Sequence, residues 1–290
     1  MSAEKAQLPY VTSQPVQVDL GAMSHTGKVR PGNEDHYLVA AFERSMKALL
    51  TSLREGDIPY HYADTAYGMM VADGMGGAAG GEVASRTAIS ALIELALRTP
   101  DWIMRLTKEL AEEVLQRLNQ RIKQAEAILI EKAGRDPSLL GMGTTMTVAV
   151  SQGANLVIAH VGDSRAYLLR NGQLHRLTCD HTVAQALADI GAIGPEAVES
   201  HPMRHLLTHV VGSKGGSALA DLSSLQLGDG DQVLLCSDGL TGMVEEAAIT
   251  QSLAVERPAA EACRALVEMA LEGGGLDNIT VIIARYRIPQ

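Results

Sequence analysis

Apolar residues recur at two different spacings along the chain. Over residues 82–98 and again over residues 103–129 they recur every three or four positions, which predicts two amphipathic helices that each bury one face. From residue 144 the spacing changes to two, as in half-buried strands. The predicted strands are Val16–Met23, Tyr37–Ala41, Tyr67–Ala72, Met146–Val150, Leu156–His160, Ala166–Leu169, Leu174–Leu177, Gln232–Cys236 and Ile279–Tyr286.

The connections between these strands indicate how they pair. Asn171-Gly172 lies between two predicted strands and is a strong signal for a two-residue hairpin. A later helix is expected to begin at Pro258 and to end at Gly273, as capping preferences predict. Strands that cluster in hairpins, instead of alternating with helices, are typical of antiparallel sheets with helices packed outside. The sequence therefore predicts an α+β fold.

Several segments follow neither period. Residues 1–15 are polar and contain two prolines, and we expect a loose N-terminal tail there. Residues 43–64 fit no clean period and are expected to form a surface excursion. Residues 181–220 are predicted to be irregular or helical. Since no internal repeat separates these parts, we expect residues 16–290 to form a single domain.

Composition and charge narrow the class of protein. The 290 residues carry 24 basic and 34 acidic side chains, a net charge of −10, and 46% of them are apolar, which is typical of a globular protein. An acidic chain with one Trp and one Phe is a poor candidate for nucleic-acid binding. No apolar run is long enough to span a membrane. Three scattered cysteines, Cys179, Cys236 and Cys263, favour reduced thiols over a zinc site. We expect a cytoplasmic protein.

Acidic residues stand where the predicted strands begin or end. Placed there, several carboxylates would share one edge of a buried sheet, and their mutual repulsion would be costly. Hard divalent cations remove that cost, and carboxylate, carbonyl and water ligands suit Mg²⁺ or Mn²⁺ better than zinc. The acids in question are Glu34, Asp35, Asp73, Asp163, Asp238 and Asp277.

A simpler interpretation as a turn residue must be weighed for each of these acids, and it is strongest for Asp73 and Asp238, because Asp-Gly is a common turn dipeptide. For Asp73-Gly74 that interpretation is weakened, since a glycine-rich loop and a helix follow instead of a returning strand. For Asp163, the interpretations as a turn residue and as a site residue both stay open. Asp229 and Asp231 are predicted to lie in a solvated turn.

Two other motifs compete for the glycine-rich segments. Residues 74–79 fit the G-x-G-x-x-G/A pattern of dinucleotide-binding folds, but the chain lacks the repeated βαβ units which that fold requires. Residues 162–166 nearly match a nucleophile elbow, but the last residue differs and a strand follows where a helix is needed. Neither motif is adopted.

Taken in order, the segments resemble the metal-dependent protein phosphatase family (PPM, type 2C), in particular its bacterial serine/threonine branch. The resemblance runs from about residue 16 to residue 287. The matching segments are VRPGNED at 29–35, VADGMGGAAGGEVAS at 71–85, GMGTT at 141–145, HVGDSRAYLLRNGQL at 160–174, CDHTVAQAL at 179–187, HPMRHLLTHVVG at 201–212, LLCSDGLTGMV at 234–244 and GLDNITVIIAR at 275–285.

The resemblance implies an αββα sandwich of two antiparallel sheets with a two-metal centre at one end. Asp73 would bridge two Mn²⁺ or Mg²⁺ ions, and the Gly74 carbonyl would help to hold one of them. Asp238 and Asp277 would ligate the other ion. Glu34 would lie on the second ion, with Asp35 in a supporting role beside it.

The resemblance also implies a third, weaker metal site at Asp163 and a phosphate contact from Arg30. Metal-activated water would attack the phosphate monoester directly, with no covalent phosphoenzyme. The implied function is a serine/threonine phosphoprotein phosphatase, with a serine/threonine kinase and its targets as partners. We expect it to act as a monomer, without nucleic acid or membrane.

The chain departs from the family pattern at several positions. Met75 replaces the His of animal members, which leaves the general acid open among His36, His181, His205 and metal-bound water. Residues 181–212 resemble a mobile flap, in which His205 and His209 stand where the bacterial pattern has Asn and Arg. Two alternative functions remain open: a catalytically silent module that binds phosphoproteins, and hydrolysis of a small phosphorylated metabolite.

Overall fold

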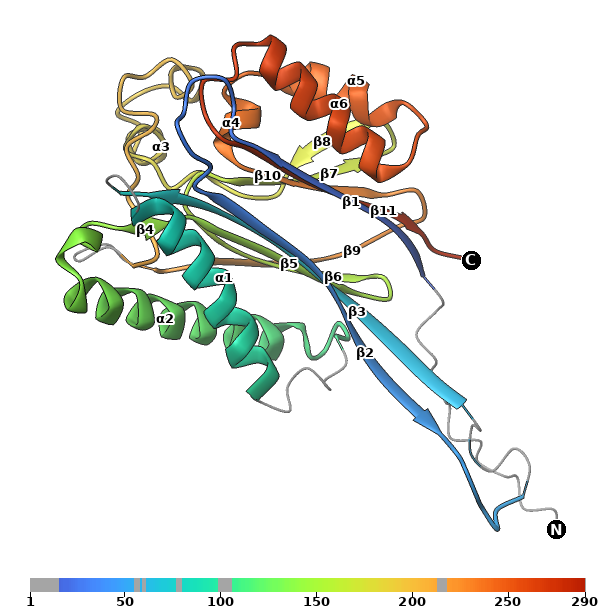
Figure 1. Ribbon diagram of the computed structural model, residues 1–290. Helices are drawn as coiled ribbons and strands as arrows, with labels where there is room; N and C mark the ends of the chain where they lie inside the picture. The colour runs from blue at the N-terminus through green and yellow to red at the C-terminus, as the bar shows by residue number, and fades with distance from the viewer. Residues whose placement is uncertain are drawn as a thin grey trace.

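The computed structural model describes residues 16–54, 58, 61–76, 80–98, 106–212 and 218–289. The predicted tail, residues 1–15, lies outside the described residues. Two antiparallel sheets pack face to face, and helices cover both outer faces (Figure 1). This is the α+β sandwich that the sequence predicts.

The first sheet has the strand order β1-β11-β10-β7-β8, and every pair in it is antiparallel. The predicted hairpin joins β7 to β8, where Asn171 and Gly172 both adopt positive φ, at 51° and 75°. Its strands are β1 (Gln17–His25), β11 (Ile279–Arg287), β10 (Gln232–Cys236), β7 (Arg165–Arg170) and β8 (Gln173–Arg176).

The second sheet has the strand order β2-β3-β5-β6-β9, with a short strand β4 that pairs with the end of β3. Its strands are β2 (Asp35–Lys47), β3 (His61–Met75), β4 (Gly143–Thr144), β5 (Met146–Gln152), β6 (Asn155–Val161) and β9 (Asp221–Gln226). The paired β2 and β3 extend well beyond the rest of the sheet (Figure 1).

The helices separate into two outer layers. Two long helices pack on the second sheet, α1 (Gly80–Arg98) and α2 (Ala111–Arg135). Three others pack on the first sheet, α4 (Asp238–Thr241), α5 (Glu246–Ala254) and α6 (Ala259–Glu272). The described connections hold α3 (Val183–Asp189) and the 3₁₀ turns Pro137–Leu139 and Pro195–Ala197. Among the described residues, no helix is both long and apolar enough to cross a bilayer.

The central strands are buried on both faces, which explains their near-continuous apolar sequences. Ile282 and Leu235 face the second sheet, where they pack with Met69 and Ile158. Ile283, the next residue along β11, faces the α6 side. Each such side chain contributes roughly 1.5–3 kcal/mol by burial. This double burial holds the strand ends, and the side chains they carry, in fixed positions.

Two sequence predictions about helices and strands need correction. The second long helix begins at Ala111, not at residue 103 as predicted. Residues 103–105 lie outside the described residues, and residues 106–110 are described but are not part of the helix. Leu106 is buried but not helical, because its backbone N–H donates to the Gln152 side chain. Strand β9 was not predicted, since DLSSLQ has too few apolar residues to show a period.

The segment 43–64 is not wholly a surface excursion. The β2–β3 pairing continues through Glu43↔Thr65 to Lys47↔His61, so part of this segment forms strand. Both faces of this arm carry polar side chains, and Arg44 donates to the Tyr62 hydroxyl across the pair at 2.6 Å. Apolar alternation is therefore missing even though the backbone is extended.

The turn at residues 228–231 is only partly solvated. Asp229 is exposed, as predicted, but Asp231 is buried. The Arg170 guanidinium donates to both carboxylate oxygens of Asp231, at 3.0 Å from Nε to Oδ1 and 2.5 Å from Nη2 to Oδ2. Asp231 therefore fastens the turn to β7, and its prediction as a solvated residue is wrong.

Candidate active site

Four strands bring their acidic residues to one edge of the sandwich. Asp35 opens β2 and lies opposite Asp73 in the β2–β3 register. Asp238 follows β10 after one residue, and Asp277 precedes β11 by one residue. A cavity of about 790 Å³ lies at this edge. It is lined by seven of the eight residues that the sequence singled out: Arg30, Glu34, Asp73, Gly74, Asp163, Asp238 and Asp277.

The backbone of Asp73 is held from two sides by threonines. Its N–H donates to Thr145 Oγ1 at 2.9 Å, and its carbonyl accepts from Thr145 N and Thr144 Oγ1, both at 2.8 Å. These threonines belong to the short GMGTT segment that joins α2 to β5. The position of Asp73 in the cavity is therefore fixed by the backbone and not only by its own side chain.

Glycine is required at position 74 because three chain segments meet there. A Cβ on Gly74 would lie 2.1 Å from the Gly81 carbonyl oxygen and 2.7 Å from the Glu34 carbonyl oxygen. The Gly74 N–H donates to that Glu34 carbonyl at 3.2 Å. Any side chain here would push the start of α1 and the Glu34 loop apart.

Asn278 holds the loop that carries Arg30 and Glu34. Its Nδ2 donates to the carbonyls of Thr26 and Gly32, both at 2.9 Å, and its Oδ1 accepts from the Glu34 N–H at 2.7 Å. Sequence reasoning did not single out this residue. Its position beside Asp277, directly before a buried strand, was the available signal.

Asp35 lies behind the cavity wall instead of lining it. Its Oδ2 accepts hydrogen bonds from the hydroxyls of Ser237 and Thr280, both at 2.7 Å, while its Oδ1 is buried without a partner. Burial raises the pKa of this carboxyl to about 7, against the lowering effect of the two hydroxyls. Asp35 therefore ties β2 to the starts of α4 and β11.

The carboxylates of the cavity destabilise one another's charges. Burial raises the pKa of Asp73 well above its usual value, and the neighbouring Asp35 and Asp238 raise it further. Burial likewise raises the pKa of Asp163, with Asp238 as the next cause. The pKa of Asp238 is raised by burial and by Asp277. A cation among them would remove this repulsion.

The donor set at the cavity fits a hard divalent cation. Among the described residues, no three His, Cys, Asp or Glu side chains are gathered closely enough to hold an ion as they stand. Asp238 Oδ1, however, is buried at the cavity with no hydrogen-bond partner, and the surrounding donors are carboxylate oxygens. Such oxygens are the ligands that Mg²⁺ and Mn²⁺ take.

Arg30 pairs directly with one acid of this set. Its Nη2 donates to Asp277 Oδ2 at 2.6 Å, and this hydrogen bond is the main reason why the pKa of Arg30 is raised. The other oxygen of Asp277 accepts from the Asn278 N–H at 2.8 Å. About half of the Arg30 side chain is exposed, so its remaining donors can reach a ligand in the cavity.

The segment 181–212 supplies one wall of the cavity through residues 204–207. Of the three histidines proposed as general acid, only His205 lines the cavity, with its Nδ1 3.8 Å from Asp238 Oδ2. His181 is occupied elsewhere: it accepts from the Gly162 N–H and pairs with Asp221. His36 interacts with the Ser85 hydroxyl at 2.9 Å.

Known proteins are similar to this chain in sequence. The family model described as Protein phosphatase 2C matches residues 60–272. The chain is 38% identical over 216 residues to the serine/threonine protein phosphatase PstP of Mycobacterium tuberculosis, which is 74% of this chain and 40% of PstP. It is 35% identical over 222 residues to the serine/threonine phosphatase stp of Listeria innocua, 77% of this chain and 85% of that relative. The chain belongs to the protein phosphatase 2C family.

Solved structures agree with this assignment. The crystal structure of M. tuberculosis PstP superposes with a TM-score of 0.74 at 34% identity, over 93% of this chain and 99% of that one. The Streptococcus agalactiae serine/threonine phosphatase gives a TM-score of 0.75 at 28% identity, over 94% and 100%. The PstP catalytic domain, solved in complex with two manganese ions, gives 0.72 at 33% identity, over 94% and 99%.

Proposed function

We propose that this protein is a metal-dependent phosphatase that hydrolyses phosphoserine and phosphothreonine in proteins. The observation that carries the proposal is the convergence of Asp73, Asp238 and Asp277 with Arg30 around one cavity. The family assignment and the names of the relatives support the substrate class.

In this proposal the cavity binds two Mn²⁺ or Mg²⁺ ions. Asp73, Glu34, Asp238 and Asp277, together with the Gly74 carbonyl, would hold these ions. Asp163 offers a third, weaker position. Two such cations, when bound, would offset the charge of the phosphate and lower the pKa of a water molecule. The manganese complex of PstP supports this cofactor assignment.

The protein's own groups orient the substrate. Arg30 offers planar guanidinium donors that suit two phosphate oxygens at once. To do so it shares or gives up its bond to Asp277, which frees Oδ2 as a ligand. Water then attacks phosphorus, its oxygen forms the new P–O bond while the bond to the serine or threonine oxygen breaks, and one of the water protons passes to that leaving oxygen. No covalent phosphoenzyme is formed.

Buried hydrogen bonds around the site keep Arg30 and the carboxylates in position. Asp35 holds β2 against Ser237 and Thr280, and Asn278 holds the Arg30 loop. We further propose that residues 16–290 form a single phosphatase domain with residues 181–212 as its flap, acting as a cytoplasmic monomer on the targets of a serine/threonine kinase.

Removal of the metal tests the proposal directly. Hydrolysis of a phosphoserine peptide is measured with Mn²⁺, with excess chelator, and after Mn²⁺ is restored. We expect activity to disappear under chelation and to return with Mn²⁺, while circular dichroism stays unchanged. Activity that persists under chelation would contradict the mechanism. A faster rate on small phosphorylated metabolites than on phosphopeptides would contradict the substrate class.

A further inference from the structure

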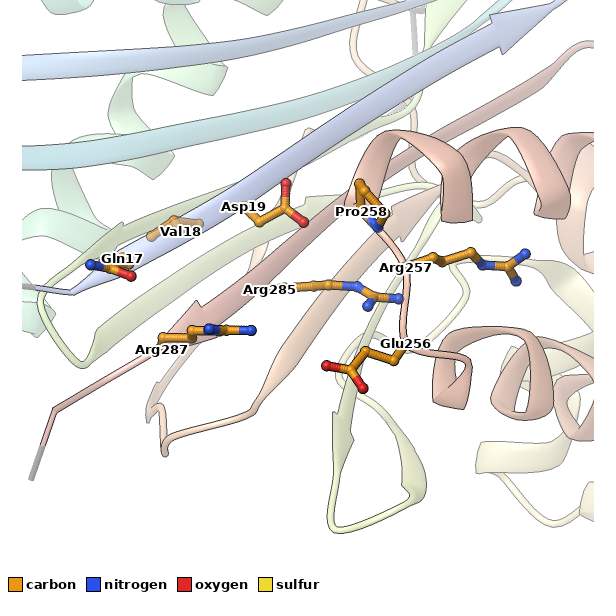
Figure 2. Close-up of a pocket in the computed structure, with 8 residues that line it drawn as sticks. All are labelled: Gln17, Val18, Asp19, Glu256, Arg257, Pro258, Arg285 and Arg287. Atoms are coloured by element: carbon orange, nitrogen blue, oxygen red, sulfur yellow. The ribbon is translucent and has the colours of Figure 1, made fainter.

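A second cavity lies at the opposite end of the first sheet from the acidic one. β11 begins at the acidic edge and ends at Arg287, eight positions after its first residue. At roughly 3.3 Å per residue the two ends are about 26 Å apart. The second cavity has a volume of about 730 Å³ and lies between β1, the end of β11 and the segment before α6 (Figure 2). We call it the arginine cavity, after Arg257, Arg285 and Arg287 in its wall.

None of these three arginines has a carboxylate partner within ion-pair distance in the part of the chain that the structure describes. Most other described ion pairs are short, as in Arg86–Glu82 at 2.8 Å and Arg170–Asp231 at 2.5 Å. In a chain of net charge −10, three arginines without such partners at one cavity stand out. Their positive charge is therefore not neutralised by salt bridges of the described residues.

The two acids in the same wall do not fill this role. Asp19 lies opposite Arg285 in the β1–β11 register, but its Oδ2 accepts the N–H of Ala259 at 2.8 Å and so caps α6. Glu256 is exposed, and its side chain and that of Arg257 point in opposite directions (Figure 2). Both acids leave guanidinium nitrogens unpaired.

Backbone contacts hold two of the guanidinium groups in place. Arg257 Nη2 donates to the Ser252 carbonyl at 2.8 Å and to its hydroxyl at 2.7 Å. Arg285 Nη2 makes long contacts to the carbonyls of Leu253 and Val255, at 3.4 and 3.3 Å. The Nε atoms of both arginines are buried without a partner. The described hydrogen bonds of both guanidinium groups use Nη2 alone, so their geometry is set while other donors of each group have no described partner.

Electrostatics at Arg285 point in the same direction. Burial lowers the pKa of its guanidinium, and the charge of Arg257 lowers it further, against the raising effect of Asp19. Positive charge is therefore costly in this wall. An anion bound there would remove the cost and supply acceptors for the unused donors.

We propose that the arginine cavity binds the phosphate group of a ligand at a site separate from the catalytic cavity. Phosphate fits better than a carboxylate because it offers more acceptor oxygens and up to two negative charges to several guanidinium forks. The same group is present in free inorganic phosphate and in a phosphoserine side chain. The site thus lets the protein hold a phosphate without placing it in the acidic cavity.

Phosphate binding to variants of the full chain tests the proposal. Inorganic phosphate is titrated calorimetrically in excess chelator, because the acidic cavity without cations repels anions. Arg287 is exposed and makes no described side-chain contact, so Arg287→Gln is expected to fold normally. Arg264→Gln, on the exposed face of α6, removes the same charge elsewhere and is the control.

We expect Arg287→Gln, and Arg257→Gln as a second variant, to bind phosphate about tenfold more weakly than wild type, since one charged hydrogen bond is lost. Arg264→Gln should bind as wild type does. With Mg²⁺ restored, Arg287→Gln should hydrolyse an aryl phosphate at the wild-type rate. No phosphate binding by the wild type, or equal binding by all variants, would overturn the proposal.

A phosphoserine peptide in the same titration identifies the source of the phosphate. Tighter binding of the peptide than of inorganic phosphate, lost in Arg287→Gln, supports a docking site for phosphorylated protein. Equal affinities support a site for free phosphate. Peptide binding that is insensitive to both arginine variants would count against the cavity altogether.

Discussion

The two ends of the first sheet carry opposite charges that the protein itself does not fully neutralise. At one end, Asp238 and Asp277 lie with Asp73 around a cavity, and burial with mutual repulsion raises the pKa of Asp73 and Asp238. At the other end, Arg257 and Arg285 have buried Nε atoms without partners. The strands between them are apolar on both faces.

A rigid sandwich can keep a cation-binding end and an anion-binding end apart. Because most residues of β10 and β11 are buried, neither end can relax by bending its strands. Like charges at each end therefore stay close together, and a ligand of opposite charge would stabilise them. A cation suits the acidic end, and an anion suits the arginine end. Variants at each end test this contrast.

The largest effect is expected from Asp238→Ala. Loss of this carboxylate removes a proposed ligand, so turnover of a phosphopeptide should fall about a thousandfold, beyond the roughly 10–100-fold cost of losing a residue that only supports a ligand. The fold should survive, since the Asp238 side chain repels its neighbours. Mn²⁺ binding, measured by calorimetry, should weaken in parallel.

The matched control is Glu268→Ala, which removes a carboxylate from the exposed face of α6. It should keep wild-type turnover. Full activity in Asp238→Ala would refute the role given to that residue.

Arg30→Gln should have the next largest effect. Loss of a charged hydrogen-bond donor to phosphate should lower kcat/KM about 10–100-fold. Steady-state kinetics with a phosphopeptide measure it, and Lys28→Gln, in the same loop, is the control. An unchanged kcat/KM in Arg30→Gln would show that Arg30 serves only as the partner of Asp277.

Asp231→Ala should affect stability and leave catalysis alone. It removes the partner of Arg170 near the arginine end, and since the Arg170 side chain is 38% exposed, we expect a loss of about 1–3 kcal/mol in the free energy of unfolding. Urea denaturation measures the loss. Asp229→Asn, which changes the same charge in the exposed part of the turn, should cost much less; equal losses would contradict the structural role of the pair.

The smallest effect concerns acid stability through His160. Burial lowers the pKa of this histidine from 6.5 to about 4, with His181 as the next cause. The unfolded chain therefore binds a proton that the folded chain does not, and stability present above pH 6.5 is lost as the pH falls toward 4. His160→Gln should make the free energy of unfolding depend less steeply on pH over this range. An unchanged slope would assign the acid sensitivity to other groups.

The parts of the fold that rest on apolar patterning could be predicted from the sequence. Strand Gln232–Cys236 and the helix between Pro258 and Gly273 are confirmed, because buried faces and capping residues leave local signals. β9 and the outer part of the β2–β3 arm could not be predicted, since their side chains are largely polar and show no apolar period. Their backbone is extended because it pairs with another strand.

The same distinction holds for the site. Acids at strand ends are visible in the sequence, and the resemblance to a family supplied their proposed roles. The partners that fix them were not visible. Thr145 holds Asp73 from 72 positions away, and Asn278 holds the Glu34 loop from 244 positions away. The buried Asp231 was misjudged for this reason, because its partner Arg170 lies on another strand.

Anomalous X-ray scattering from crystals soaked in Mn²⁺ would count and place the bound ions. We expect two strong manganese peaks in the acidic cavity, with Asp73 between them and Asp238 and Asp277 on one of them. A weaker third peak is expected near Asp163. Manganese bound away from these carboxylates, or none bound at all, would contradict the proposed metal binding.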